Sequence, residues 1–139
     1  MNPKKPISKK NILVIDADEE FSRDVRLYLE ENYHVTTRQD LEFLDYTIIL
    51  KKTDLLILEA DYADRNLLKM IEQIKQNHPT IKILIMYTYF RSDTLVEKAL
   101  VRDADDVIAK PFDVVMLKNK VDQLLSQTAM KQRSSLSRQ

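Results

Sequence analysis

The sequence LLILEADYAD, residues 55–64, begins with a run of apolar residues and turns acidic at Glu59. A short, continuous apolar run of this kind is typical of a strand in a parallel sheet that helices cover on both faces. Four further runs, the last of them weaker and more polar, lie at residues 12–15, 81–86, 107–109 and 34–37. We therefore expect five parallel strands, with the polar one at an edge of the sheet.

Between these runs, apolar residues recur at the spacing of amphipathic helices. The clearest stripe comprises Leu67, Met70, Ile71 and Ile74, which fall at positions i, i+3, i+4 and i+7 of one helix face. Comparable stripes lie within residues 21–29, 41–48, 95–100 and 117–125. Strands that alternate with helices in this way predict an α/β fold, in which a doubly wound, five-stranded parallel sheet carries helices on both faces.

The composition of the 139-residue chain fits one ordinary globular domain and excludes several kinds of site. The chain contains no glycine, which excludes the P-loop and the dinucleotide-binding fingerprint, because both need glycine where the backbone approaches phosphate. It contains no cysteine, so disulfides, thiolate nucleophiles and cysteine metal sites are excluded. No apolar run approaches the roughly 18 residues that cross a membrane, and a cytoplasmic protein without membrane contact is the simplest interpretation.

The charged residues are unevenly distributed, although the formal net charge is zero. All 22 acidic residues lie within residues 11–128, while residues 1–10 and 129–139 hold only basic charges. We therefore expect a basic N-terminal tail at 1–10, one domain at 11–128 and a flexible polar tail at 129–139. An acidic domain with short basic tails is not typical of a nucleic-acid-binding surface, so we expect no direct contact with nucleic acid.

Polar side chains stand where four of the predicted strands end. Asp16, Glu59, Thr88 and Lys110 follow the first, third, fourth and fifth strands. In open parallel sheets, ligands bind beyond the carboxyl ends of the strands, so we expect these side chains to form one site. Local roles compete with this interpretation. Asp16 and Asp18 also suit a helix N-cap, and Thr88 suits a strand because it is β-branched. Glu59 could equally be a solvated acidic residue at the end of a strand, without a role in a site.

Three segments together resemble the receiver domain of bacterial two-component response regulators. They are ILVIDADEEF (12–21), DLLILEAD (54–61) and ALVRDADDVIAKPF (99–112). Thr88 and Lys110 are also separated as in that family, and the resemblance covers residues 11 to about 128. It implies a flavodoxin-like sheet with strand order 2-1-3-4-5 and a cis peptide bond between Lys110 and Pro111.

The resemblance also implies a chemistry for the strand ends. In the receiver family, an aspartate at the end of the third strand accepts a phosphoryl group from a histidine kinase, and an acidic pair after the first strand holds Mg²⁺. The threonine and lysine at the positions of Thr88 and Lys110 contact the phosphoryl oxygens. Each residue type has a physical reason, because a hard cation needs several oxygen ligands and a lysine neutralises phosphoryl charge.

This chain departs from the family pattern at the positions that carry this chemistry. Glu59 stands where the acceptor aspartate belongs, and Ala17 stands at the second acidic position, which resembles the direct metal ligand. Asp16 keeps the first acidic position, and Asp61 matches the position that offers a backbone carbonyl to the metal. Val107 replaces the aromatic residue that the family often uses as a switch. Asp16, Glu59 and Asp61 are therefore the remnant of a metal site, and we expect any Mg²⁺ binding to be weak.

The longer side chain of Glu59 suggests a different role. It carries the carboxylate one methylene beyond the acceptor position, and a misplacement of ~1 Å can slow a reaction about 10²-fold. We expect Glu59 to pair with Lys110 in a partly desolvated pocket, in space that a metal or phosphoryl group would fill. The pocket then becomes a fixed structural element locked in one state, with the switch positions at Thr88 and Val107.

Three functions remain open at this point. The leading one is a non-catalytic pseudo-receiver that binds other signalling proteins, such as a histidine kinase or a second copy, without phosphorylation. The family uses the face made by the fourth helix, fifth strand and fifth helix, which here corresponds to parts of 92–101, 107–109 and 113–125. The second function is a working phosphoacceptor that uses Glu59 or Asp61 with Mg²⁺. The third is the regulatory domain of a transcription factor.

Overall fold

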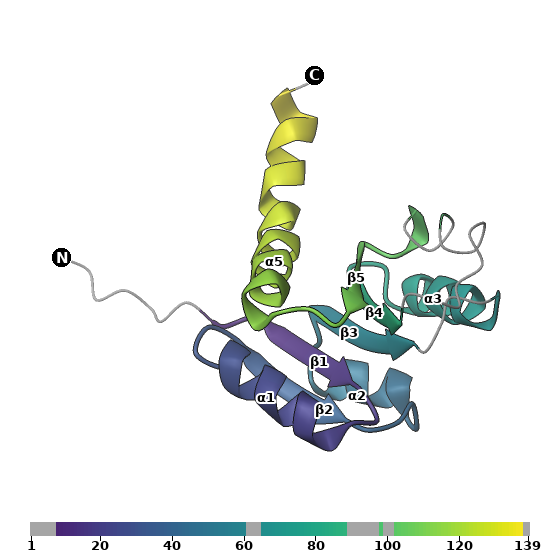
Figure 1. The fold of residues 1–139 in the computed structure, drawn as a ribbon. Coiled ribbons are helices and arrows are strands. Elements are labelled where there is room, and N and C mark those ends of the chain that lie inside the picture. Colours follow the sequence, from purple (N-terminus) through teal and green to yellow (C-terminus); the bar gives the residue numbers. More distant parts are fainter. Residues whose placement is uncertain (1–7, 61–64, 89–97, 99–101, 138–139) are drawn as a thin grey trace.

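The computed structural model describes residues 8–60, 65–88, 98 and 102–137 of the chain. Its elements are β1 (Asn11–Ile15), α1 (Glu19–Leu29), β2 (His34–Arg38), α2 (Leu44–Leu50), β3 (Leu55–Ala60), α3 (Arg65–Asn77), β4 (Lys82–Thr88), β5 (Asp106–Lys110) and α5 (Val114–Ser137). The strands form one parallel sheet in the order β2-β1-β3-β4-β5 (Figure 1). The predicted fold class and strand order are confirmed. The predicted stripe within 95–100 lies, except for residue 98, outside the described residues.

Helices cover both faces of this sheet, and each face has its own apolar core. Leu13 and Ile15 of β1 belong to the core beneath α2 and α3, whereas Ile12 and Val14 belong to the core beneath α1 and α5. This alternation follows from the strand period of two residues. Because both faces are covered, a central strand such as β3 reads as one continuous apolar run. Burial of one such side chain contributes roughly 1.5–3 kcal/mol.

The sequence leads to one prediction for the edge strand and another for the C-terminal segment. The polar strand β2 lies at an edge of the sheet, as predicted. Helix α5 continues to Ser137, so the backbone of 129–137 is helical, and the expected flexibility of this segment stays a prediction. That expectation rests on polarity, whereas the segment lacks glycine and proline and contains good helix formers such as Met130 and Lys131. Among the described residues, no helix is both long and apolar enough to span a bilayer.

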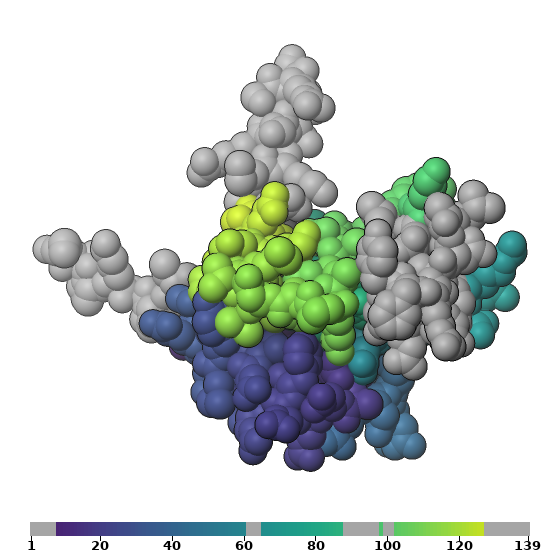
Figure 2. All heavy atoms as spheres, in the orientation of Figure 1, coloured from purple at the N-terminus to yellow at the C-terminus, as the bar shows by residue number. Residues whose placement is uncertain are grey.

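Helices α1 and α5 lie side by side on one face of the molecule (Figure 2). Their shared core includes Val25 and Leu29 of α1 and Val121 of α5. The Tyr33 hydroxyl, just after α1, donates a hydrogen bond to Asp122 of α5. At the other end of α1, Phe21 in the first turn contacts Phe112, which follows β5, close to the candidate site.

Candidate functional site

The carboxyl ends of β1, β3 and β5 bring the predicted polar residues to one rim of the sheet. β1 and β3 pair in parallel with Ile15 opposite Leu58, so Asp16 and Glu59 follow neighbouring strand positions. Lys110 ends β5 and pairs with the backbone of Thr88 on β4. The predicted site is therefore assembled from separate parts of the chain, whereas Asp61 lies outside the described residues.

The Lys110 ammonium is the centre of this site. Its Nζ donates to Oδ2 of Asp16 at 2.8 Å and to Oε1 of Glu59 at 3.2 Å. The predicted pair between Glu59 and Lys110 is thus present, and Asp16 makes the shorter of the two contacts. The Asp16 side chain has no exposed area, while those of Lys110 and Glu59 are 23% and 26% exposed. Two carboxylates therefore share one ammonium in a pocket that is largely withdrawn from water.

The remaining oxygens of both carboxylates accept backbone hydrogen bonds. Glu59 Oε2 accepts from the Ala17 N–H at 3.1 Å, and Asp16 Oδ1 accepts from the Asp18 N–H at 2.9 Å. Each acid is thus held at two points, by the ammonium and by the loop after β1. These contacts supply the hydrogen-bond partners that offset the desolvation of a buried carboxyl group.

Asp18, not Asp16, is the N-cap of α1. Its carboxylate accepts from the Phe21 N–H at 3.1 Å, and Glu19 and Glu20 stand in the first turn, where they favour the positive end of the helix dipole. Of the two candidate caps in the sequence, the structure selects Asp18. Asp16 instead belongs to the pocket, and its backbone carbonyl receives a hydrogen bond of 3.5 Å from the Ser22 hydroxyl.

Two aromatic residues complete the pocket and were not anticipated from the sequence. Lys110 Nζ lies 4.5 Å from the centroid of the Phe21 ring, in a cation–π contact. Phe112 meets Phe21 edge to face, with ring centroids 5.8 Å apart and an interplanar angle of 79°. The available signal was the phenylalanine that follows Lys110-Pro111, together with an aromatic residue in the first turn of α1. The predicted cis bond between Lys110 and Pro111 is present.

Opposing influences set the pKa of Lys110. Burial lowers the pKa because desolvation disfavours the ammonium, whereas hydrogen bonds to Asp16 and Glu59 and attraction by their charges raise it. The raising influences prevail, so the pKa of Lys110 lies above its ordinary value. The ammonium is therefore a permanent part of the folded pocket at neutral pH.

This raised pKa predicts that the free energy of unfolding falls in alkaline solution. An unfolded lysine loses its proton near pH ~10.4, whereas folded Lys110 keeps its proton to a higher pH. In that interval the folded state binds more protons than the unfolded state. The contribution of Lys110 to the free energy of unfolding is therefore complete below the unfolded pKa and is lost as the pH rises toward the folded pKa. Burial and the hydrogen bond to Asp122 also raise the pKa of Tyr33, which adds a loss of the same sign.

Urea unfolding across the alkaline range measures this loss. The Tyr33→Phe variant removes the contribution of the phenol and leaves Lys110 in place. We expect the decline in unfolding free energy to become shallower in the variant and to persist. A variant whose stability no longer changed with alkaline pH would contradict the raised pKa of Lys110.

Comparison with known proteins identifies the family to which this fold belongs. The family model of the response regulator receiver domain matches residues 12–122. The chain belongs to the response regulator receiver family. It is therefore a receiver domain of two-component signalling. That Glu59, at the end of β3, stands at the phosphoacceptor position stays a prediction from the sequence.

The curated relatives of this receiver are longer regulators. The transcriptional regulatory protein KdpE of Staphylococcus aureus is 30% identical over 115 residues, which cover 81% of this chain and 48% of KdpE. The response regulator ArlR of Staphylococcus saprophyticus is 32% identical over 122 residues, which cover 86% of this chain and 54% of ArlR. The chain thus spans about half the length of these relatives.

Solved structures share the architecture of this receiver. A two-component response regulator from Clostridium difficile is 27% identical, with a TM-score of 0.72, and the match covers 86% of this chain and 98% of that one. The orphan response regulator HP1043 of H. pylori is 22% identical, with a TM-score of 0.74, and the match covers 86% of this chain and 99% of that one. The second likeness concerns the fold alone.

The pocket of this receiver does not fit the Mg²⁺ that the family implies. Ala17 presents a methyl group where a carboxylate oxygen is needed, and Lys110 Nζ already lies between Asp16 and Glu59. A divalent cation placed between the same carboxylates would be repelled by the ammonium at close range. Within the described part of the chain, no group of three or more histidine, cysteine, aspartate or glutamate side chains is placed to hold a metal ion.

The two switch positions are placed by the sheet. Val107 lies on β5 opposite Ile85 of β4 and is partly buried against the core beneath α3. The backbone of Thr88 pairs with Lys110 at the ends of the same two strands. Thr88 therefore lies next to Lys110, and Val107 lies three residues before Lys110 on the same strand. Their part in switching stays a prediction.

Proposed function

We propose that this receiver is a phosphorylation-independent, non-catalytic signalling module that acts by binding other proteins. The observation that carries the proposal is the ammonium of Lys110, which contacts Asp16 at 2.8 Å and Glu59 at 3.2 Å. In this arrangement the acceptor position and the metal position are bridged by a residue of the chain itself. The absence of cysteine suits a reducing compartment, and we place the module in the cytoplasm.

The contacts of Glu59 explain why phosphoryl transfer is disfavoured. One carboxylate oxygen binds Lys110 and the other accepts the Ala17 N–H, so both oxygens are fixed in orientation and are weaker nucleophiles than those of a free carboxylate. The added methylene of glutamate also displaces the carboxylate, and ~1 Å of displacement can cost about 10²-fold in rate. The methyl group of Ala17 leaves the phosphoryl charge without the metal that would balance it.

Intact-mass spectrometry tests the proposal directly. The natural protein is incubated with Mg²⁺ and a small acyl phosphate, beside a receiver that has an aspartate at the acceptor position as a check on the donor. We expect the control to gain a phosphoryl group and the natural protein to remain unmodified. A phosphorylated natural protein would instead support a working phosphoacceptor, and peptide mapping would then decide between Glu59 and Asp61.

The partners that we propose are signalling proteins, such as a histidine kinase or a second copy. The family's usual face includes β5 and the start of α5, where Val114, Val115 and Met116 are 36%, 55% and 48% exposed. Three adjacent apolar side chains at a helix start support a binding role for this face. The rest of the face, within 92–101, belongs almost entirely to the undescribed residues.

A second candidate is the regulatory domain of a transcription factor. It rests on the similarity to KdpE, a transcriptional regulatory protein of which the match covers 48%. An antibody raised against this receiver would test it on extracts of the source cells. A product about twice the size of this chain would support the candidate, and a product of the size of the chain would count against it.

A further inference from the structure

Helix α2 is apolar on its outer side as well as its inner side. Ile48 is buried in the core and Thr47 is 6% exposed. The opposite side carries four large apolar residues with exposed fractions of 57% to 78%, which we call the α2 surface: Phe43, Tyr46, Ile49 and Leu50. The outer side of α2 thus carries a cluster of large exposed apolar side chains, and such a patch marks a surface for a partner.

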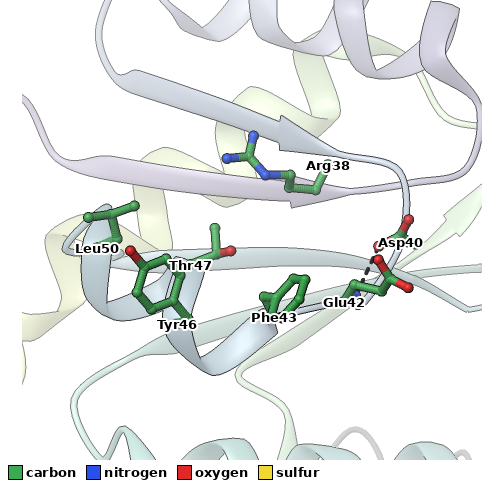
Figure 3. A pocket seen from close by; sticks show the side chains of 7 residues that line it. All are labelled: Arg38, Asp40, Glu42, Phe43, Tyr46, Thr47 and Leu50. Carbon is green, nitrogen blue, oxygen red and sulfur yellow. Dashed lines mark hydrogen bonds between the residues drawn. The ribbon is translucent and has the colours of Figure 1, made fainter.

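The α2 surface borders a hollow of about 620 Å³ between α2 and the end of β2. Figure 3 shows Phe43, Tyr46 and Leu50 along α2, with Arg38 across the hollow at the end of β2. A hollow of this size accepts several side chains of a partner. Its wall is mostly apolar, and it also holds the guanidinium of Arg38 and the carboxylates of Asp40 and Glu42. Asp45, at the start of α2, lies 2.9 Å from Nε2 of His78, which anchors the helix to the chain after α3.

The backbone at Phe43 supports the same conclusion. Phe43 has φ 56° and ψ 33°, in the left-handed region, and its side chain makes no capping hydrogen bond. This conformation is unfavourable for a bulky residue, and such strain is concentrated at binding sites. With 78% of the residue exposed, burial within this chain does little to offset the strain. A partner that covers the ring would supply the missing contact.

We propose that the α2 surface binds the α2 surface of a second copy, with the two helices antiparallel about a two-fold axis. Charges at the ends of the surface identify this occupant. Exposed Asp40 and Glu42 precede α2, and exposed Lys51 and Lys52 follow it. Antiparallel pairing places the acidic end of each helix against the basic end of the other.

The residue positions are self-complementary about a centre between Tyr46 and Thr47. A two-fold axis at this centre sets Glu42 against Lys51 of the second copy and Phe43 against Leu50 of the second copy. A partner that is acidic throughout would be repelled by Glu42, and one that is basic throughout would be repelled by Lys51. A second copy supplies the required reversed order of charges by symmetry alone.

This self-association is expected to be weak, because α2 is only seven residues long and an interface of this length falls at the small end of protein interfaces. The inference places self-association on a surface other than the β5 and α5 face of the proposed function, and it does not involve the Lys110 pocket. The two proposals can fail separately. A protein that does not dimerise could still resist phosphorylation, and a protein that is phosphorylated could still dimerise through the α2 surface.

Analytical ultracentrifugation from micromolar to millimolar concentration tests the proposal. We expect the natural protein to shift from monomer to dimer over this range. Leu50→Ser should weaken the association roughly tenfold or more, as truncation of a central apolar anchor does. Leu27→Ser is the matched control, because Leu27 of α1 and Leu50 have the same exposed fraction of 57%. The control should dimerise like the natural protein.

Charge exchange tests the antiparallel arrangement. Glu42→Lys and Lys51→Glu should each weaken self-association, since each sets like charges opposite one another twice in the dimer. An equal mixture of the two variants should associate again, because both contacts then join a lysine to a glutamate. A natural protein that stays monomeric at millimolar concentration would overturn the proposal, as would a mixture no better associated than its components.

Phe43→Asn separates binding from folding. Asparagine tolerates the left-handed conformation better than phenylalanine, so we expect the melting temperature of the monomer to rise by about 2–4 °C. The same variant should dimerise less well, because the ring is lost. Higher stability with unchanged self-association would place Phe43 outside the interface and overturn the proposed pairing.

Discussion

The Ala17→Asp/Glu59→Asp variant is expected to gain a phosphoryl group under conditions that leave the natural protein unmodified. The first substitution returns a carboxylate to the loop after β1, next to Asp16. The second shortens the acid at the end of β3, which withdraws the carboxylate from the Lys110 ammonium, now 3.2 Å from Glu59 Oε1. Together they recreate an oxygen-rich pocket with an acid at the acceptor position.

The expected reaction is a simple transfer. An oxygen of the new carboxylate at position 59 attacks the phosphorus of the acyl phosphate, the bond between phosphorus and the acyl oxygen breaks, and the donor's carboxylate leaves. Each natural residue obstructs this step by at least about 10²-fold, through position or missing charge. Because both act on one site, the effects are not additive, and we expect either single variant to remain unmodified.

Intact mass in the presence and absence of Mg²⁺ measures the gain, and circular dichroism confirms that each variant is folded. Adding Asp16→Asn to the double variant serves as the control, since it removes a pocket carboxylate and should abolish the gain. A folded double variant that stays unmodified would show that Glu59 and Ala17 are not what prevents transfer. The contact of Phe21 with Lys110 at 4.5 Å would then be the next feature to remove.

The sequence predicts the fold well because the fold depends on burial. Each buried strand is a short apolar run, and β2 is polar because it lies at the edge of the sheet. The pair between Glu59 and Lys110 was also predictable, because residues that end parallel strands meet at one rim. The shorter contact of Lys110 with Asp16 could not be predicted, because it depends on how far the loop after β1 turns toward the pocket.

Two features could not be predicted from the sequence, for physical reasons. Phe21 and Phe112 meet only because α1 and the segment after β5 pack together, and neither is near the other in the sequence. Helix α2 has apolar residues on both sides, so its periodicity does not tell which side faces the core. The stripe predicted within 41–48 consists of Leu41, Leu44 and Ile48. The structure buries Ile48 and leaves Leu41 42% exposed.

Lys110→Met is expected to lower the free energy of unfolding by about 2–4 kcal/mol. Methionine keeps an apolar chain of similar length, so the loss is mainly electrostatic. The substitution leaves Asp16, whose side chain has no exposed area, beside Glu59 with no cation between them. Removing one partner of a buried ion pair costs roughly 3–5 kcal/mol, and the partial exposure of Lys110 and Glu59 reduces that figure.

Urea denaturation of three variants measures this effect and its origin. Lys120→Met is the matched control, because Lys120 also contacts an aspartate, Asp106, at 3.0 Å, but both side chains are about one-third exposed. It should cost less than about 1 kcal/mol. Asp16→Asn in the Lys110→Met background should recover roughly 1–3 kcal/mol of the loss, because it removes the charge that is left without a partner. If Lys110→Met were as mild as Lys120→Met, the pocket would be a solvated cluster rather than a structural element. The locked state on which phosphorylation independence rests would then lack its physical basis.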